Sequence, residues 1–121
     1  MINDRGFTLI EVLITMAIFS IGILAVALLQ VNSINRNTTA RMHTEATVVA
    51  VDWLERLRSL PYNHPDLIED QPHQAQAGTY IVQWQVSEDN NLPLKTITVS
   101  VDSDNPNARS VSVSSRKPQA P

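Results

Sequence analysis

The chain has 121 residues, enough for one small domain and an appendage. Its formal net charge of -3 argues against the broad basic surface that binds nucleic acid or anionic lipid, so we expect no nucleic-acid partner. It has no cysteine, which excludes disulfides and cysteine metal sites.

The first predicted element is an apolar helix over residues 7–29. Between Phe7 and Leu29 the only charged residue is Glu11, and proline is absent. A helix of this length is roughly 35 Å long, which is enough to cross the hydrocarbon core of a bilayer. Because a backbone in lipid must satisfy its hydrogen bonds internally, we interpret residues 7–29 as a transmembrane helix with the lipid bilayer as its surroundings.

Three other interpretations of this run compete. A secretory signal peptide has a shorter apolar core and a small-residue cleavage site after it, whereas QVNSINR follows Leu29. A plain single-span anchor fits the length but leaves Glu11 unexplained. A buried helix of a soluble domain is disfavoured by the length of the run.

The carboxylate of Glu11 needs an explanation of its own. Glu11 lies only about 6 Å along the helix from Phe7, so its side chain can snorkel to the lipid headgroups. An ionisable residue inside a span is otherwise expected to mark a functional site with a partner. No basic side chain lies inside the run, and Arg5 precedes it. Both interpretations stay open on the residues alone.

The start of the run carries a specific motif. Residues 5–11 read RGFTLIE, and an unbroken apolar helix follows. This arrangement resembles the start of a type IV prepilin or pseudopilin. The resemblance implies a leader of residues 1–6, cleavage between Gly6 and Phe7 by a prepilin peptidase/N-methyltransferase on the cytoplasmic side, and N-methylation of Phe7. It also implies that Glu11 pairs with the N-terminal ammonium of a neighbouring subunit during filament assembly.

Elementary electrostatics agrees with this assembly role. Two opposite charges attract strongly in a poorly hydrated helix bundle, whereas either charge alone is costly to bury. A contact from Glu11 of one chain to Phe7 of the next is heterologous and does not close, so its repetition generates a helical filament. Glu11 and Phe7 are therefore the predicted assembly residues.

The second predicted element is an amphipathic helix over residues 30–59. Apolar side chains recur there at steps of three or four, while charged side chains fall largely on other faces. The apolar positions are Met42, Ala46, Val49, Ala50, Trp53, Leu54 and Leu57. Because nothing after Leu29 forces a break, we expect one helix from about Phe7 to Ser59, ended by Pro61.

A loop over residues 60–78 and a small sheet over residues 79–115 follow. Three segments alternate apolar and polar residues with the period of a half-buried strand: TYIVQWQVS, LKTITVSVD and RSVSVSS. Turn-forming residues over 88–93 and 102–107 separate them, and such short links favour an antiparallel meander. We therefore predict an α+β fold, in which the long N-terminal helix packs on a small antiparallel three-stranded sheet and residues 116–121 form a frayed tail.

The helix and the sheet are expected to share one core. Trp53 and Leu57 should pack on the inward face of the sheet with Tyr80, Val82 and Trp84. A long N-terminal helix on a small antiparallel sheet is also the architecture of pilins, so the derived layout and the resemblance agree.

Further features resemble a minor pilin more than a major one. The segment ERLRSLPY, residues 55–62, is similar to the minor pilins of the PilV kind. The chain lacks the cysteine pair that staples a C-terminal loop in major pilins, and its apolar half lacks a proline. The resemblance therefore implies a minor type IV pilin-like subunit that enters or primes a pilus filament. It would cross the inner membrane once and hold residues 30–121 in the periplasm, with other pilin subunits and the inner-membrane assembly platform as partners.

Two alternatives to this function stay open. A minor pseudopilin of a type II secretion system shares the same N-terminal chemistry and fold. A single-span membrane-anchored binding module would keep residues 1–6 and would not polymerise.

Other chemistry has little support in the sequence. Residues 64–73 place two histidines and three carboxylates in one loop, but their spacing matches no known ligand pattern, and a solvated acidic loop is favoured. Asp102 begins a stretch like a calcium loop, but Pro106 takes its fifth position and Val113 stands where a glutamate should be. A phosphate-binding glycine loop, a nucleophile elbow and a Cys/His pair are missing from the sequence. We expect no metal, no other cofactor and no enzymatic activity.

Overall fold

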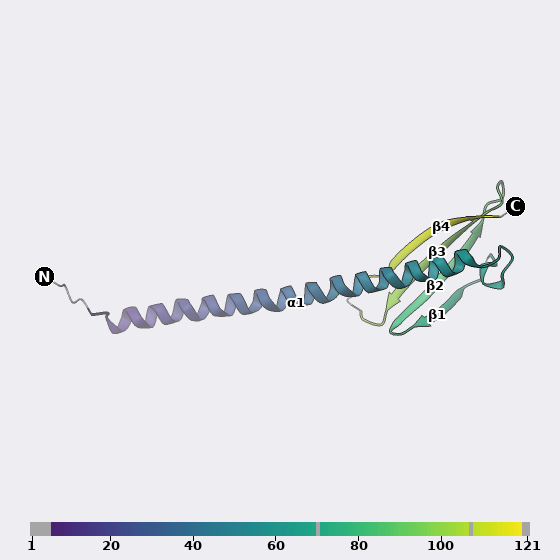
Figure 1. Ribbon diagram of the computed structural model, residues 1–121. Helices are drawn as coiled ribbons and strands as arrows, with labels where there is room; N and C mark the ends of the chain where they lie inside the picture. The colour runs from purple at the N-terminus through teal and green to yellow at the C-terminus, as the bar shows by residue number, and fades with distance from the viewer. Residues whose placement is uncertain (1–5, 70, 107, 120–121) are drawn as a thin grey trace. The chain divides into compact units, whose positions relative to one another are not determined.

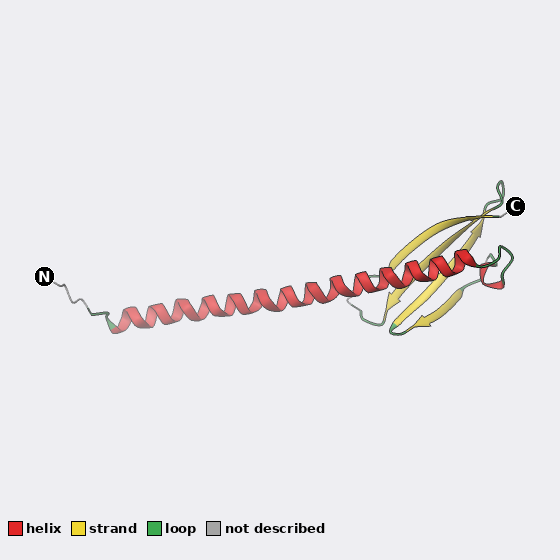
Figure 2. Ribbon diagram, viewed as in Figure 1, coloured by secondary structure: helices red, strands yellow, loops and turns green. Residues whose placement is uncertain are grey.

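The computed structural model describes residues 6–69, 71–106 and 108–119. Over these residues the chain forms one long helix, a short 3-10 helix and a four-stranded sheet (Figure 1, Figure 2). The elements are α1 (Leu9–Ser59), η1 (Pro65–Leu67), β1 (His73–Ala77), β2 (Tyr80–Glu88), β3 (Leu94–Ser103) and β4 (Val111–Pro118). The chain divides into two compact units, of which the first ends at Thr38 and the second begins at Thr39.

The sheet is an antiparallel meander in the order β1-β2-β3-β4. The predicted α+β class is confirmed, and β2, β3 and β4 are the three segments whose alternation predicted strands. The expectation of three strands is wrong, because β1 adds a fourth strand to the described sheet within the segment interpreted as a loop.

β1 carries little strand signal in its sequence. HQAQA lacks the β-branched and aromatic residues that are typical of strands, so pairing with β2 makes it a strand. A tight turn joins Ala77 to Tyr80, and Gly78 in this turn has a φ of 63°, a left-handed conformation that glycine adopts without strain.

β4 is longer than expected. Residues 116–118 belong to this strand, although they were predicted to form part of a frayed tail. All three pair with β3, and the Gln119 N–H donates to the carbonyl oxygen of Pro93 at 2.9 Å. These backbone bonds fix the segment against the freedom of a chain end. Residues 120–121 of the predicted tail and Asn107 of the predicted turn lie outside the described residues.

The part of α1 from Thr39 to Ser59 packs on one face of the sheet. Its buried side chains are those of Ala46, Ala50 and Leu57, and the two alanines allow the helix backbone to lie close to the strands. The predicted alternation of the strands is confirmed. The buried inward residues are Tyr80, Val82, Trp84, Val86, Ile97, Val99 and Val101, and Val111 and Val113 pack against them.

Trp53 joins this core from its margin. The Trp53 ring stacks on Trp84, with ring centroids 5.4 Å apart and planes inclined by 25°, so the predicted contact between helix and strand is present. Trp84 is buried, and its indole N–H donates to the carbonyl oxygen of Asp66 at 3.0 Å. Trp53 itself is only partly buried, and the guanidinium carbon of Arg56 lies 5.9 Å from the centroid of its ring.

A buried lysine holds the loop that follows α1. Lys95 is only 7% exposed, and its ammonium group donates to the carbonyl oxygens of Tyr62 at 2.9 Å and Leu67 at 3.1 Å. The same nitrogen lies 4.3 Å from the centroid of the Tyr62 ring. A buried charge is tolerated when it is hydrogen-bonded in this way. Lys117, directly opposite on β4, donates to the carbonyl oxygen of Arg58 near the end of α1.

A second polar contact ties α1 to β2. The hydroxyl of Tyr80 donates to the Glu45 carboxylate at 3.1 Å, and the Arg41 guanidinium forms an ion pair with the same carboxylate at 3.0 Å. The hydrogen bonds from Arg41 and Tyr80 hold the pKa of Glu45 below its ordinary value. Burial, together with the nearby carboxylate, raises the pKa of Tyr80.

Candidate functional site

The three residues that the sequence marked, Gly6, Phe7 and Glu11, lie before and within the first turn of α1. The helix begins at Leu9, two residues later than the predicted start at Phe7. The reason is a cap: Thr8 accepts the Glu11 N–H on its backbone oxygen at 3.1 Å and on its side-chain oxygen at 3.3 Å. Sequence reasoning missed Thr8, although the spacing from Thr8 to Glu11 is the threonine-x-x-glutamate pattern of a capping box.

Gly6 and Phe7 precede this cap and are open to their surroundings. Phe7 is 82% exposed. A Cβ placed on Gly6 would meet no heavy atom of the described residues within 4 Å. The described part of the chain therefore gives no packing reason for glycine at this position, and we expect the requirement for a small residue there to come from the peptidase.

Glu11 lies in the first turn of α1 and is exposed. It is the only charged residue from Phe7 to Asn35. No ion pair joins its carboxylate to another residue among those that the structure describes. A carboxylate in a first turn interacts favourably with the helix dipole, but this effect is only about 0.3–1 kcal/mol near water.

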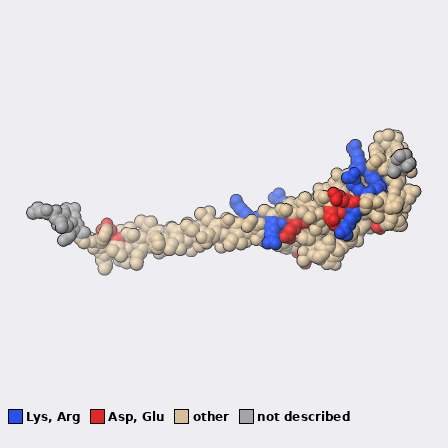
Figure 3. Space-filling view, in the orientation of Figure 1, with Lys and Arg blue, Asp and Glu red and all other residues tan. Residues whose placement is uncertain are grey.

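The helix beyond Glu11 presents apolar side chains on all sides. Every large apolar residue from Leu9 to Ile34 is at least 46% exposed, and Figure 3 shows a long stretch without charged atoms after the acidic patch near the start of the helix. Thr15 and Ser20 direct their hydroxyls back to helix carbonyl oxygens at 2.7 Å, so these polar groups are satisfied without water. This is the one helix in the described part of the chain that is long and apolar enough to cross a membrane.

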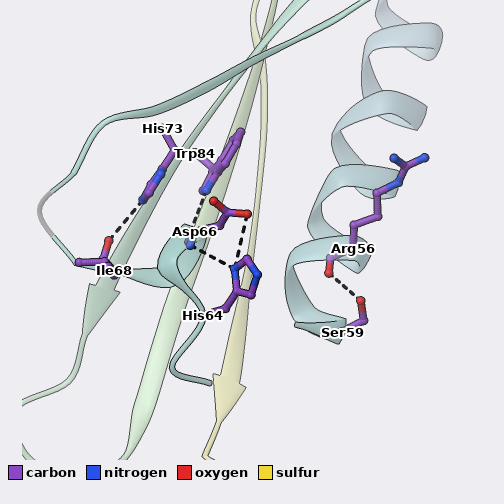
Figure 4. A network of polar contacts seen from close by, with 7 residues as sticks. All are labelled: Arg56, Ser59, His64, Asp66, Ile68, His73 and Trp84. Carbon is purple, nitrogen blue, oxygen red and sulfur yellow. Dashed lines mark hydrogen bonds and ion pairs between the residues drawn. The ribbon is translucent and has the colours of Figure 1, made fainter. Parts of the chain in front are cut away.

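The two histidines of residues 64–73 that suggested a metal site are engaged by nearby residues (Figure 4). The Nδ1 atom of His64 accepts the Asp66 N–H at 3.2 Å. His73 stacks on Trp84, with ring centroids 5.2 Å apart and planes inclined by 4°, and its Nε2 lies 3.4 Å from the carbonyl oxygen of Ile68.

No group of three or more histidine, aspartate or glutamate residues suited to a metal ion occurs among the residues that the structure describes. Asp70, the remaining carboxylate of that loop, lies outside them. The stretch that begins like a calcium loop at Asp102 is divided between the end of β3 and the turn after it.

Comparison with known proteins gives a match at the start of the chain. Residues 1–27 match the model of the prokaryotic N-terminal methylation motif. No curated protein and no solved structure matches the chain. The motif covers Gly6, Phe7 and Glu11, and it implies processing by a prepilin peptidase and assembly with pilin-type subunits. With the exposed apolar helix it fits anchoring in the inner membrane. The chain thus carries the N-terminal methylation motif of type IV pilin-like precursors, which supports a place for it in the pilin and pseudopilin family.

Proposed function

We propose that the protein is a minor type IV pilin-like subunit that is processed after Gly6 and then enters or primes a filament. The match of residues 1–27 to the N-terminal methylation motif carries this proposal. The small head on α1 supports it, since the four described strands add only a compact domain to the helix. The protein acts through assembly and not through catalysis.

The processing step follows from the geometry around Gly6. The peptide bond between Gly6 and Phe7 lies before the helix cap and is open, so a peptidase can reach it without unfolding α1. Cleavage converts the Phe7 nitrogen from an amide into an amine, which is positively charged at neutral pH and is then N-methylated. The new cation lies at the apolar end of a helix whose own carboxylate, that of Glu11, has no partner among the described residues.

In the assembled state Glu11 of one subunit pairs with the Phe7 ammonium of the next. Before cleavage the chain crosses the inner membrane once, with its leader in the cytoplasm and its head in the periplasm. The pair makes both charges tolerable in the helix bundle, and its repetition sets the axial offset between subunits.

Substitution of Glu11 tests the assembly step. Glu11→Ala and Glu11→Gln should leave membrane insertion, cleavage and head folding intact, because Glu11 is not one of the residues that form the core of the head. Each should lower the ratio of subunit in sheared filaments to subunit in membranes by at least about ten-fold, since a buried ammonium without its partner costs several kcal/mol. Wild-type ratios for both variants would refute the pairing.

Two further variants separate loss of the Glu11 pair from loss of any exposed glutamate and from failed cleavage. Glu55→Gln is the matched control, because Glu55 is an exposed glutamate on the same helix within the head, and it should assemble at the wild-type ratio. Gly6→Leu should keep the leader and fail at cleavage, an earlier step than the one that Glu11 affects. The filament in which the wild-type subunit is found, a pilus or a type II secretion pseudopilus, decides between these two systems.

A further inference from the structure

The chain segments that contain the two outer strands of the sheet differ in the sign of their charge. The segment from Leu60 to Thr79, which leads into and contains β1, has acidic residues and no lysine or arginine. The segment from Asn105 to Gln119, which contains β4, has Arg109, Arg116 and Lys117 and no acidic residue. β1 and β4 are the two outer strands of the described sheet and lie at opposite edges of it (Figure 1).

One acidic and one basic side chain lie at nearly the same position along the strands, at opposite edges of the sheet. On the acidic edge, a Glu69 carboxylate oxygen accepts the N–H of Glu88 at 3.0 Å, where β2 extends beyond the end of β1. Glu88 pairs with Lys95, and Lys95 pairs with Lys117 beside Arg116 on the basic edge. Glu69 and Arg116 are both exposed. A second sheet set beside the first at the same level therefore brings the acidic side chain of one next to the basic side chain of the other.

The strand directions also fit such an arrangement. Each strand of the meander runs opposite to its neighbour, so β1 and β4, with two strands between them, run in opposite directions. When β4 of one copy lies beside β1 of a copy in the same orientation, the two strands are antiparallel. Both strands have one ladder of backbone groups without a neighbour in the described sheet, and an open edge of this kind is a template for strand pairing.

We propose that the β4 edge of one head docks on the β1 edge of a second copy of this chain, with Arg116 facing Glu69 across the contact. The contact is heterologous, because it joins different edges, and each copy keeps one edge of each kind free for a further neighbour. The inference rests on the proposed function only in that two copies share one membrane and hold their heads on the same side of it. It can be tested before any filament forms, so its failure is distinguishable from failure of the Glu11 pairing.

Disulfide cross-linking of the full chain in membranes tests the contact. Because the sequence has no cysteine, only the introduced cysteines can form a disulfide. Gln74 and Ser112 are exposed outward residues at the same level, because both lie in the row that passes through Gln83 and Ser100. Within one copy β1 and β4 are three strand spacings apart, about 14 Å. A disulfide needs Cα atoms within about 7 Å, so any bond in the double variant Gln74→Cys/Ser112→Cys joins two copies.

The proposal predicts a ladder of cross-linked dimers and larger species from this double variant under mild oxidation. Each single variant, Gln74→Cys or Ser112→Cys, should stay monomeric, because like edges do not meet. A missing ladder would overturn the proposal. So would a Ser112→Cys variant that forms as much dimer as the double variant, since this would show two β4 edges paired with each other.

A charge exchange tests the role of Arg116 and Glu69 separately. One copy carries Ser112→Cys and the other carries Gln74→Cys, and both are expressed together. Arg116→Glu in the first copy, or Glu69→Arg in the second, should lower the cross-linked fraction about three- to ten-fold. The two substitutions together should restore it, and added salt should weaken the wild-type contact. Failure of the combined exchange to recover the cross-link would show that these two side chains do not face each other.

Discussion

Replacement of Lys95 by methionine tests how the loop after α1 is held. The ammonium group donates to the carbonyl oxygens of Tyr62 at 2.9 Å and Leu67 at 3.1 Å, and Lys95→Met keeps the apolar stem but removes both donors. A buried acceptor left without a donor costs about 1–3 kcal/mol. The bond to Leu67 is buried and the bond to Tyr62 is partly buried, while methionine avoids the cost of burying a charge. We therefore expect the free energy of unfolding to fall by about 2 kcal/mol.

Denaturant titration of the full chain in detergent, followed by tryptophan fluorescence, measures this loss. In a thermal melt a change of this size lowers the Tm by roughly 10 °C for a domain of about this length. Lys117→Met is the matched control, because Lys117 lies opposite Lys95 but donates to an exposed carbonyl oxygen. Its loss should stay below about 1 kcal/mol. Equal losses for the two variants, or a Lys95→Met variant as stable as the wild type, would refute the reasoning.

Two further predictions concern the contact between α1 and β2. Trp53→Ala should lower the free energy of unfolding by about 2 kcal/mol, less than the ~3–5 kcal/mol of a fully buried tryptophan, because Trp53 is partly exposed but stacks on Trp84. A denaturant titration that shows no loss would mean that the stack contributes nothing. The pKa of Glu45 is held below its ordinary value near 4.5, so its stabilising contribution is present above that pH and is lost as pH falls through the folded-state pKa. Tyr80→Phe removes one of the causes, so its stability should fall less steeply in acid than that of the wild type, and parallel pH profiles would contradict this.

The helix and three of the strands follow from periodicity in the sequence. Apolar and polar residues alternate from Tyr80 to Val86 and from Ile97 to Val101, so only one face of each strand suits a core. In both strands this apolar face is the buried one, as predicted. The end of α1 at Ser59 follows in the same way from Pro61.

What the sequence analysis missed depends on contacts between distant residues. β1 has no strand propensity of its own and forms because an open edge of β2 lies beside it. Lys95 lies two residues before Ile97, on the same face of the same strand, so its inward position was readable from the alternation. The hydrogen-bond partners of Lys95 could not be predicted, because only the course of the loop brings the carbonyl oxygens of Tyr62 and Leu67 to its ammonium group.

In the candidate site, too, some features were predicted from the sequence and others became visible only in the structure. Gly6, Phe7 and Glu11 were found from the resemblance of residues 5–11 to the start of a prepilin, and the motif match covers all three. The structure adds that the described residues give no packing reason for glycine at position 6, and that Thr8 caps the helix. The placement of these oppositely charged segments at the two edges could not be predicted, because it depends on which strands lie at the edges, and one of them was not expected to be a strand.

The central claim, that the chain is a processed pilin-like subunit, is tested most directly by the intact mass of the protein extracted from membranes of its host. A processed subunit should begin at Phe7 and carry one additional methyl group on its amino terminus. Gly6→Leu, measured alongside, should give the unprocessed mass. A wild-type protein that retains Met1 to Gly6 in the membrane and in any filament would contradict processing after Gly6 and would favour a plain single-span anchor.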